Sequence, residues 1–208
     1  MGLGVSVGAG SVAPGDSEAL EYYRGGLDRL SAALAERGIT WCEPTTRAPY
    51  MRRHVGGFPY SYLPYLRRAF ALLGHDAPVT PTGSAGVTAR DDSLIQTEMS
   101  MMSSHLLCHA DNAGYYVPAD FSEPLFLSGN LYGGGLVGSS QGLMDELRRL
   151  APALGIALTD DGELTDDEAA RVGRIPDEAD FAIESVVWLA LFEACRVSIA
   201  SGHAVIFH

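Results

Sequence analysis

Reactive side chains crowd into one short stretch of the chain, "SSHLLCHADNAGYYVP" at residues 103–118. Two histidines, a cysteine and an aspartate fall within seven positions, as His105, Cys108, His109 and Asp111. Imidazole, thiol and carboxylate groups serve as catalytic acids, bases and nucleophiles, and as ligands for transition metals. We therefore expect a pocket at this stretch, with these four residues as its catalytic groups.

The spacing of the two histidines suits a metal site if the stretch is helical. Residues four apart share one face of a helix, so His105 and His109 would point the same way, as in zinc-binding helices. Glu98 lies seven residues before His105, two turns away on the same face. In this interpretation Glu98, His105 and His109 are three ligands for a transition metal such as zinc or iron.

The same stretch can also be extended. In a strand His105 and His109 share one face, and Cys108 lies on the other. One or both histidines would then line a metal-free pocket, while Cys108 would lie in the core, where free cysteines are common. A third interpretation makes both histidines buried structural groups without chemistry. The sequence leaves all three interpretations open.

Cys108 is also a candidate nucleophile. A cysteine attacks as the thiolate, and a basic or cationic neighbour favours the thiolate by lowering the thiol pKa. On a strand, the adjacent His109 would point away from Cys108. His203, distant in the sequence, suits the role of partner better.

A second nucleophile pattern is "GSSQG" at 138–142, which matches GxSxG with Ser140 at its centre. Over these five residues it resembles the nucleophile elbow of the α/β-hydrolases, and the resemblance implies a triad of Ser140, an acid within 160–167 and His203. That elbow follows a long apolar strand, whereas only two apolar residues precede this one after a glycine run. We favour a glycine turn in which Ser139 or Ser140 caps the next helix.

The N-terminal stretch "GVSVGAGSVA" at 4–13 fits the G-x-G-x-x-A pattern of dinucleotide-binding turns. Pro14 and Gly15 follow at once, so we expect no helix to start on the glycines. No strand–helix–strand unit follows either, and a dinucleotide site is discarded.

Arginine and tyrosine side chains gather at 51–68, "MRRHVGGFPYSYLPYLRR". Arginine forks beside aromatic rings suit an anionic or planar ligand, and equally suit surface pairing with acidic residues. We take Tyr60, Tyr62 and Arg67 as ligand-binding candidates. Two tyrosines behind the histidines, Tyr115 and Tyr116, complete this set.

The C-terminal stretch 180–202 carries carboxylates on two sides of a predicted helix. A step of about 100° per residue puts Glu184 on one stripe with Trp188. Glu193 falls on another stripe, where Arg196 can pair with it at i, i+3. We therefore expect Glu184 to be the carboxylate that is partly buried, with a histidine from 105–109 as one candidate partner.

Apolar periodicity and turn residues predict the elements that position these groups. A helix over 16–39 starts at Asp16 or Ser17, and a Gly25–Gly26 pair interrupts its pattern. The stretch 94–108 fits a helix or a strand. We predict one compact α+β domain over 1–208, with at least four helices, a long apolar C-terminal helix, a small sheet of short strands and a flexible loop at 75–93.

Composition excludes several classes of function. The chain contains no lysine, and all 14 basic residues are arginine. Pyridoxal phosphate (PLP) chemistry on a lysine and phosphate-loop NTPases are therefore excluded. A net charge of −12 disfavours nucleic-acid binding, since phosphate neutralisation needs a basic surface. The acidic excess concentrates at 159–180, "TDDGELTDDEAARVGRIPDEAD", which is a solvated segment or a docking face for a basic partner.

No apolar run approaches the length of a membrane span, and the N-terminus lacks the pattern of a signal peptide. Three widely spaced cysteines indicate free thiols in a reducing compartment. We therefore expect a cytoplasmic protein without a membrane partner, and the composition suggests a bacterial source.

Two functions of different class follow. The first is a small enzyme or small-molecule-binding protein, with a His/Cys/Asp-lined pocket at 105–116 that is metal-dependent or metal-free. The second is a non-catalytic acidic interaction protein, of immunity or regulatory type, whose 159–180 segment binds a basic protein partner. We lean to the first, because packing alone accounts poorly for so many reactive residues at 103–118.

Overall fold

Six short strands form one mixed sheet in the order β2-β1-β6-β3-β5-β4 in the computed structural model, which describes residues 2–12, 14–52, 57–81, 89, 92–128 and 130–208. The pair β3 and β5 runs parallel, and the other neighbouring pairs run antiparallel. The strands are β1 (Gly2–Val7), β2 (Gly57–Pro59), β3 (Gly114–Val117), β4 (Leu125–Phe126), β5 (Leu136–Ser139) and β6 (Val205–Phe207).

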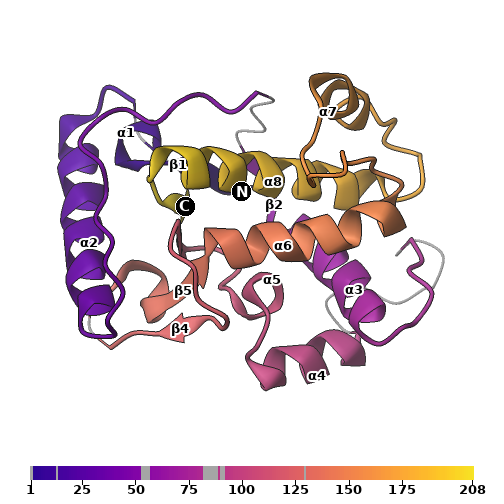
Figure 1. The fold of residues 1–208 in the computed structure, drawn as a ribbon, viewed down its shortest axis with the longest axis horizontal. Coiled ribbons are helices and arrows are strands. Elements are labelled where there is room, and N and C mark those ends of the chain that lie inside the picture. Colours follow the sequence, from indigo (N-terminus) through magenta and orange to yellow (C-terminus); the bar gives the residue numbers. More distant parts are fainter. Residues whose placement is uncertain (1, 13, 53–56, 82–88, 90–91, 129) are drawn as a thin grey trace.

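Eight α-helices accompany the sheet within the described ranges (Figure 1). They are α1 (Ala9–Val12), α2 (Ser17–Ala35), α3 (Leu63–Gly74), α4 (Ser93–Met101), α5 (His105–Cys108), α6 (Ser140–Leu150), α7 (Asp166–Val172) and α8 (Ala182–Ser201). Short 3-10 turns lie at η1 (Tyr60–Tyr62), η4 (Tyr132–Gly135) and η5 (Ala151–Leu154). The predicted α+β fold class is confirmed.

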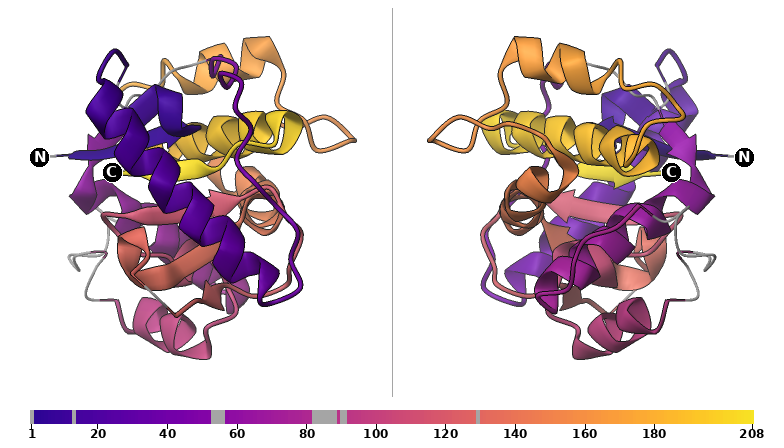
Figure 2. Two further views of the ribbon diagram at one scale, coloured as in Figure 1. Left: turned by 90° about the vertical axis from the view of Figure 1, so that its left-hand side faces the viewer. Right: turned by 90° about the vertical axis from the view of Figure 1, so that its right-hand side faces the viewer.

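Helices cover both faces of the sheet. On one face α2 lies across the strands (Figure 2), and its Leu27 and Leu34 share a core cluster with Tyr115. On the other face α3, α6 and α8 form the larger cluster, which includes Tyr116. Successive strand residues point to opposite faces, so the Tyr115–Tyr116 pair contributes one ring to each layer.

The helix α8 lies at the centre of the larger cluster. Trp188 is fully buried, stacks on Phe192 with ring centroids 4.6 Å apart, and donates from Nε1 to the Leu147 carbonyl of α6 at 2.8 Å. Buried side chains come from every side of α8, as expected for a helix that other elements surround.

The helix α2 begins where the sequence predicts, because Asp16 caps it by accepting from the Ala19 amide at 3.0 Å. The Gly25–Gly26 pair does not interrupt it. A Cβ atom at Gly26 would lie 2.8 Å from the Tyr115 hydroxyl, so glycine lets this helix approach the sheet closely.

The stretch 94–108 folds as two helices rather than a strand. Met102 adopts a left-handed φ of 58° after α4, and Ser104 then caps α5 by accepting from the Leu107 amide at 3.0 Å. This helix lasts one turn, and His109 beyond it is extended with a ψ of 149°.

One prediction about the N-terminus is wrong. A helix does start on the glycines, since α1 begins at Ala9 directly after Gly8, whose φ is 76°. The proline and glycine that follow limit α1 to one turn instead of preventing it. The pairings of β1 are antiparallel, so no parallel strand–helix–strand unit forms around it.

Residues 82–88, 90 and 91 of the predicted flexible loop at 75–93 lie outside the described residues. Among the helices of the described ranges, none combines the length and apolar content needed to cross a bilayer.

The packing of α5 on α6 predicts that Gly142→Ala destabilises the protein. A Cβ atom at Gly142 would overlap the imidazole of His105, which hydrogen bonds to Ser139 and Phe121 hold in place. Overpacking costs about 1–3 kcal/mol, whereas alanine gains at most about 1 kcal/mol over glycine in a helix. We expect a lower free energy of unfolding in urea titrations followed by circular dichroism.

Gly25→Ala in α2 is the matched control, because its Cβ would meet only the Arg29 guanidinium, at 3.6 Å. This variant should raise the free energy of unfolding by up to about 1 kcal/mol. A Gly142→Ala protein as stable as the wild type would contradict the close packing of His105 on α6.

Candidate functional site

The single turn of α5 is buried at all four residues, and side chains from other elements bind its main chain. At its N-terminal end the Glu146 carboxylate of α6 accepts from the amides of His105, at 2.8 Å, and Leu106, at 2.7 Å. The first amides of a helix have no partner within it, so this carboxylate satisfies two of them. Burial raises the pKa of Glu146 to about 7, although the amides lower it.

Arg67 of α3 binds the other end of the turn and is only 3% exposed. Its Nε donates to the Leu106 carbonyl at 2.8 Å, and its terminal nitrogens donate to the His109 carbonyl and the Asp111 carboxylate. These carbonyls lie where a helix end leaves its acceptors unpaired. We call Glu146 and Arg67 the α5 clamp.

His105 is held on both ring nitrogens. Its Nδ1 accepts from the Ser139 amide at 3.1 Å, and its Nε2 donates to the Phe121 carbonyl at 3.1 Å. Burial lowers the pKa of His105, so the ring is neutral with its proton on Nε2. Neither nitrogen is left for a substrate or a metal ion.

His109 is 2% exposed and is part of the core. Its ring lies between the carbonyls of Ala110 and Tyr115, each 3.1 Å from one nitrogen. It stacks on Tyr116 with ring centroids 4.1 Å apart. Burial lowers the pKa of His109 to about 4, and the ring faces only protein groups.

The structure does not assemble the predicted metal site of Glu98, His105 and His109. Because α5 ends at Cys108, His109 leaves the helix and does not share a face with His105. The Glu98 carboxylate lies instead 2.7 Å from Nε2 of His75. Within the described residues, no three His, Cys, Asp or Glu side chains form a group that could hold a metal ion.

The other predicted catalytic groups also contact protein partners. Burial raises the thiol pKa of Cys108, the opposite of what an activated nucleophile needs. His203, its suggested partner, bonds instead to the Thr46 carbonyl at 2.8 Å. Asp111 pairs with Arg67. Catalysis by these residues stays a prediction, and their observed contacts are structural.

The predicted ligand-binding residues do not share one pocket. Tyr115 and Tyr116 are each 1% exposed and lie on opposite faces of the sheet. The Tyr116 hydroxyl donates to the His105 carbonyl at 3.0 Å. Tyr60 and Tyr62 are partly buried against the α8 layer, and Arg67 belongs to the α5 clamp.

The GxSxG stretch is a helix cap, as predicted. The Ser139 hydroxyl caps α6 by accepting from the Gly142 amide at 3.0 Å. Ser140 is fully buried, with its hydroxyl oxygen 2.8 Å from that of Ser198. A nucleophile elbow exposes its serine, so the hydrolase resemblance does not extend to the structure.

Two carboxylates of α8 are buried, Glu184 as predicted and Glu193 in addition. Glu193 is fully buried and binds Arg52, at 2.6 Å, and Arg196, at 2.8 Å, whereas Glu184 is 3% exposed. The predicted i, i+3 pair of Glu193 with Arg196 is confirmed.

Glu146 contacts the 105–109 segment and was not among the residues predicted from the sequence. A signal for it exists in the sequence: Glu146 falls within the apolar stripe formed by Leu143, Leu147 and Leu150 of α6. An acid at such a position must find hydrogen-bond donors inside the fold.

The segment 159–180 presents the acidic surface. Nine carboxylates and two arginines lie within it. Three of these carboxylates form ion pairs: Glu163 with Arg148, Asp166 with Arg52 and Glu168 with Arg171. Six exposed carboxylates form no ion pair with any part of the chain that the structure describes, and we call them the acidic face: Asp160, Asp161, Asp167, Asp177, Glu178 and Asp180.

A closed turn carries the first two residues of the acidic face. The Thr159 amide donates to the Glu163 carbonyl at 2.9 Å, and the Glu163 amide donates to the Thr159 hydroxyl at 3.0 Å. Arg148 of α6 binds this turn through the Gly162 carbonyl, at 3.0 Å. The loop between η5 and α7 protrudes from the fold (Figure 2). Hydrogen bonds across the turn and from Arg148 nevertheless hold its main chain in place.

The helix α7 carries the next acids in its first turn. Thr165 caps the helix by accepting from the Glu168 amide at 3.2 Å. Arg52 binds the Leu164 carbonyl at 2.9 Å and the Asp166 carboxylate at 2.7 Å. Acids at a helix N-terminus are stabilised by the helix dipole, which favours Asp167 at this position.

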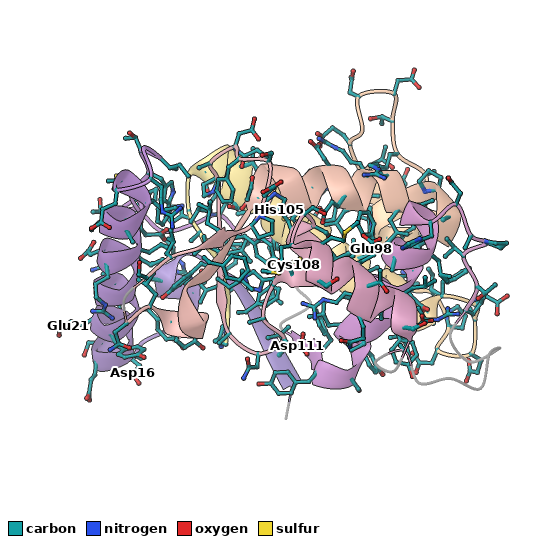
Figure 3. All side chains as sticks on the ribbon, turned by 90° about the horizontal axis from the view of Figure 1, so that it is seen from below. Asp16, Glu21, Glu98, His105, Cys108 and Asp111 are labelled. Atoms are coloured by element: carbon teal, nitrogen blue, oxygen red, sulfur yellow. The ribbon has the colours of Figure 1, made fainter. Side chains whose placement is uncertain are left out.

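A second group of acids lies at the opposite end of the long axis, on α2 (Figure 1). Glu21 points away from the fold at this end, and Asp16 and Glu21 both lie apart from His105 and Cys108 (Figure 3). Exposed arginines accompany the α2 acids, namely Arg24 and Arg29. The acidic excess is therefore stronger at the α7 end.

A family model matches residues 1–207, almost the whole chain, and its description is "Putative DNA-mimic protein". No curated protein and no solved structure matches the chain.

The α5 clamp predicts a pH-dependent stability. The pKa of the Glu146 carboxyl is about 7 in the fold, against an ordinary value of 4.5. Between pH 4.5 and pH 7, therefore, the carboxyl is protonated mainly in the folded state. Protonated Glu146 therefore stabilises the fold fully below about pH 4.5, and this contribution is lost as the pH rises through about 7. Relative to Glu146→Gln, we expect the wild type to lose about 2–3 kcal/mol of unfolding free energy over this range.

Urea titrations of both proteins at several pH values across this range measure the difference. Asp145→Asn, which changes an exposed carboxylate of the same helix, should follow the wild-type profile. Parallel profiles for the wild type and Glu146→Gln would contradict a proton held on Glu146.

Proposed function

The chain belongs to the DNA-mimic family, and we propose that it is a non-catalytic acidic protein that binds the basic surface of a DNA-binding protein. The proposal places the contact on the acidic face. The observation that carries it is the set of six exposed carboxylates at 159–180 without ion-pair partners among the described residues.

Carboxylates can replace phosphates in such a contact because both accept hydrogen bonds from the same cations. DNA-binding proteins use arginine and lysine to contact phosphate oxygens, and these contacts supply most of the sequence-independent affinity. Arginine binds carboxylate and phosphate with the same fork geometry. A surface of unpaired carboxylates therefore competes for the groups that would bind DNA.

The main chain beneath the acidic face supports this function. Arg148 binds the turn at Thr159–Glu163, and Arg52 binds the start of α7 to α8. Neither arginine forms an ion pair with a residue of the acidic face. Loops that are already ordered lose less conformational entropy on binding.

The enzyme interpretation draws no support from the contacts of the 103–118 stretch. Every ring nitrogen of its two histidines lies about 3.1 Å from a main-chain group, and Asp111 pairs with Arg67. The second of the two sequence interpretations, an acidic interaction protein with a basic partner, agrees better with the family.

We expect removal of three charges from the acidic face to weaken partner binding about tenfold to a hundredfold, since each exposed charge contact contributes up to about 1 kcal/mol. The variant is Asp160→Asn, Asp161→Asn, Asp167→Asn. The tagged wild type is used to capture proteins from a lysate of the source organism, and the bound proteins are eluted with duplex DNA. Proteins that the DNA releases are identified, purified and titrated against both forms.

A matched control removes three exposed charges from α2 and its C-cap, by Glu18→Gln, Glu21→Gln and Glu36→Gln, and should keep most of the affinity. Binding should also weaken with salt, less steeply for the acidic-face variant. If both triple variants bind alike, the acidic face is not the contact. If duplex DNA releases none of the captured proteins, the chain does not act as a DNA mimic.

A further inference from the structure

A cavity of about 420 Å³ lies where β1 ends and α1 begins, at the α2 end of the molecule. The acidic face lies at the other end of the long axis (Figure 1), so this cavity is separate from the proposed contact surface. Its volume falls in the range of small-molecule sites. The side chains that carry charge or polar ring atoms into its lining are Arg24, Asp28, Glu43, Arg47 and His203.

The inner wall of the cavity is acidic. Glu43 is half-buried, and its oxygens accept from the Ala204 amide at 2.9 Å and, more weakly, from the Ala9 amide at 3.4 Å. Burial raises the pKa of Glu43, while these amides and the charges of His203 and Arg24 lower it. A carboxylate has about four lone-pair directions, so two accepted bonds leave capacity for another donor.

His203 shapes this wall without offering a free nitrogen. It is 2% exposed, with Nε2 2.8 Å from the Thr46 carbonyl and Nδ1 3.1 Å from the Ser201 hydroxyl. A Cβ atom at Gly8 would lie 2.8 Å from the His203 ring, so glycine at this turn keeps the space open. The acceptor at the inner wall is therefore Glu43.

The outer rim carries both signs of charge. Arg24 and Asp28 are exposed one turn apart on α2, and Arg47 is exposed with its guanidinium 5.0 Å from the ring centroid of Tyr50. Within the described part of the chain, none of these three charges forms an ion pair. Two guanidinium groups thus face the cavity mouth without a carboxylate partner.

We propose that this cavity binds a small zwitterion, with its ammonium group on Glu43 and its carboxylate or phosphate on Arg24 and Arg47. A ligand with only negative charge would be repelled by Glu43 and Asp28, and one with only positive charge by the two arginines. A molecule carrying both charges, such as a free amino acid, meets an opposite charge at each end.

Isothermal titration calorimetry of the full chain tests this proposal. The probes are a panel of free amino acids together with O-phosphoethanolamine, which separates recognition of a carboxylate from recognition of a phosphate. Acetate, inorganic phosphate and methylammonium are the single-charge probes. We expect at least one zwitterion to bind, and to bind more tightly than each single-charge probe.

Arg24→Gln and Arg47→Gln should each weaken that zwitterion about tenfold, as expected for loss of one charge-assisted contact. Arg29→Gln, which changes an exposed arginine of α2 outside the cavity lining, should bind as the wild type does. All three side chains are exposed, so the variants should fold. The proposal would be overturned if no zwitterion gave a binding heat. It would also be overturned if acetate or phosphate bound as tightly as the zwitterion, or if both cavity variants kept the wild-type affinity.

Discussion

The main-chain groups of a buried helical turn need hydrogen-bond partners inside the protein, because water cannot reach them. In α5 the carboxylate of Glu146 takes the free amides and the guanidinium of Arg67 takes the free carbonyls. These two side chains come from α6 and α3, so the turn holds both helices together beneath the sheet. Removing either partner would leave polar groups buried and unsatisfied, which costs more than the bond itself contributes.

The α5 clamp also explains why the 103–118 stretch looks like an active site. A short buried turn followed by a strand needs donors and acceptors at many points, and histidine, serine and aspartate supply them. His105 joins α5 to the start of α6 through Ser139, and Asp111 pairs with Arg67 as the chain leaves the turn. The same residue types perform catalysis elsewhere, so composition alone does not separate the two roles.

Charge is arranged differently inside and outside the fold. Buried carboxylates have partners, as Glu193 does in its bonds to Arg52 and Arg196. The excess acids are placed on loops and helix starts at the surface, where water solvates their side chains. Arg52 takes part in both arrangements, since it binds buried Glu193 and exposed Asp166. An ordered surface with a strong negative excess agrees with the family description, "Putative DNA-mimic protein".

The sequence by itself determined the α+β class, a helix cap at Asp16 or Ser17, another at Ser139 or Ser140, and the acidic segment at 159–180; the structure selects Asp16 and Ser139. These features depend on periodicity, local hydrogen bonds and composition, which neighbouring residues fix. Only the tertiary structure decided that α5 stops after one turn, that Glu98 meets His75 rather than His105, and that Glu146 binds the turn. These contacts join residues far apart in the chain, and their geometry depends on how α3, α6 and the sheet pack. Spacing along the sequence carries no information about that packing.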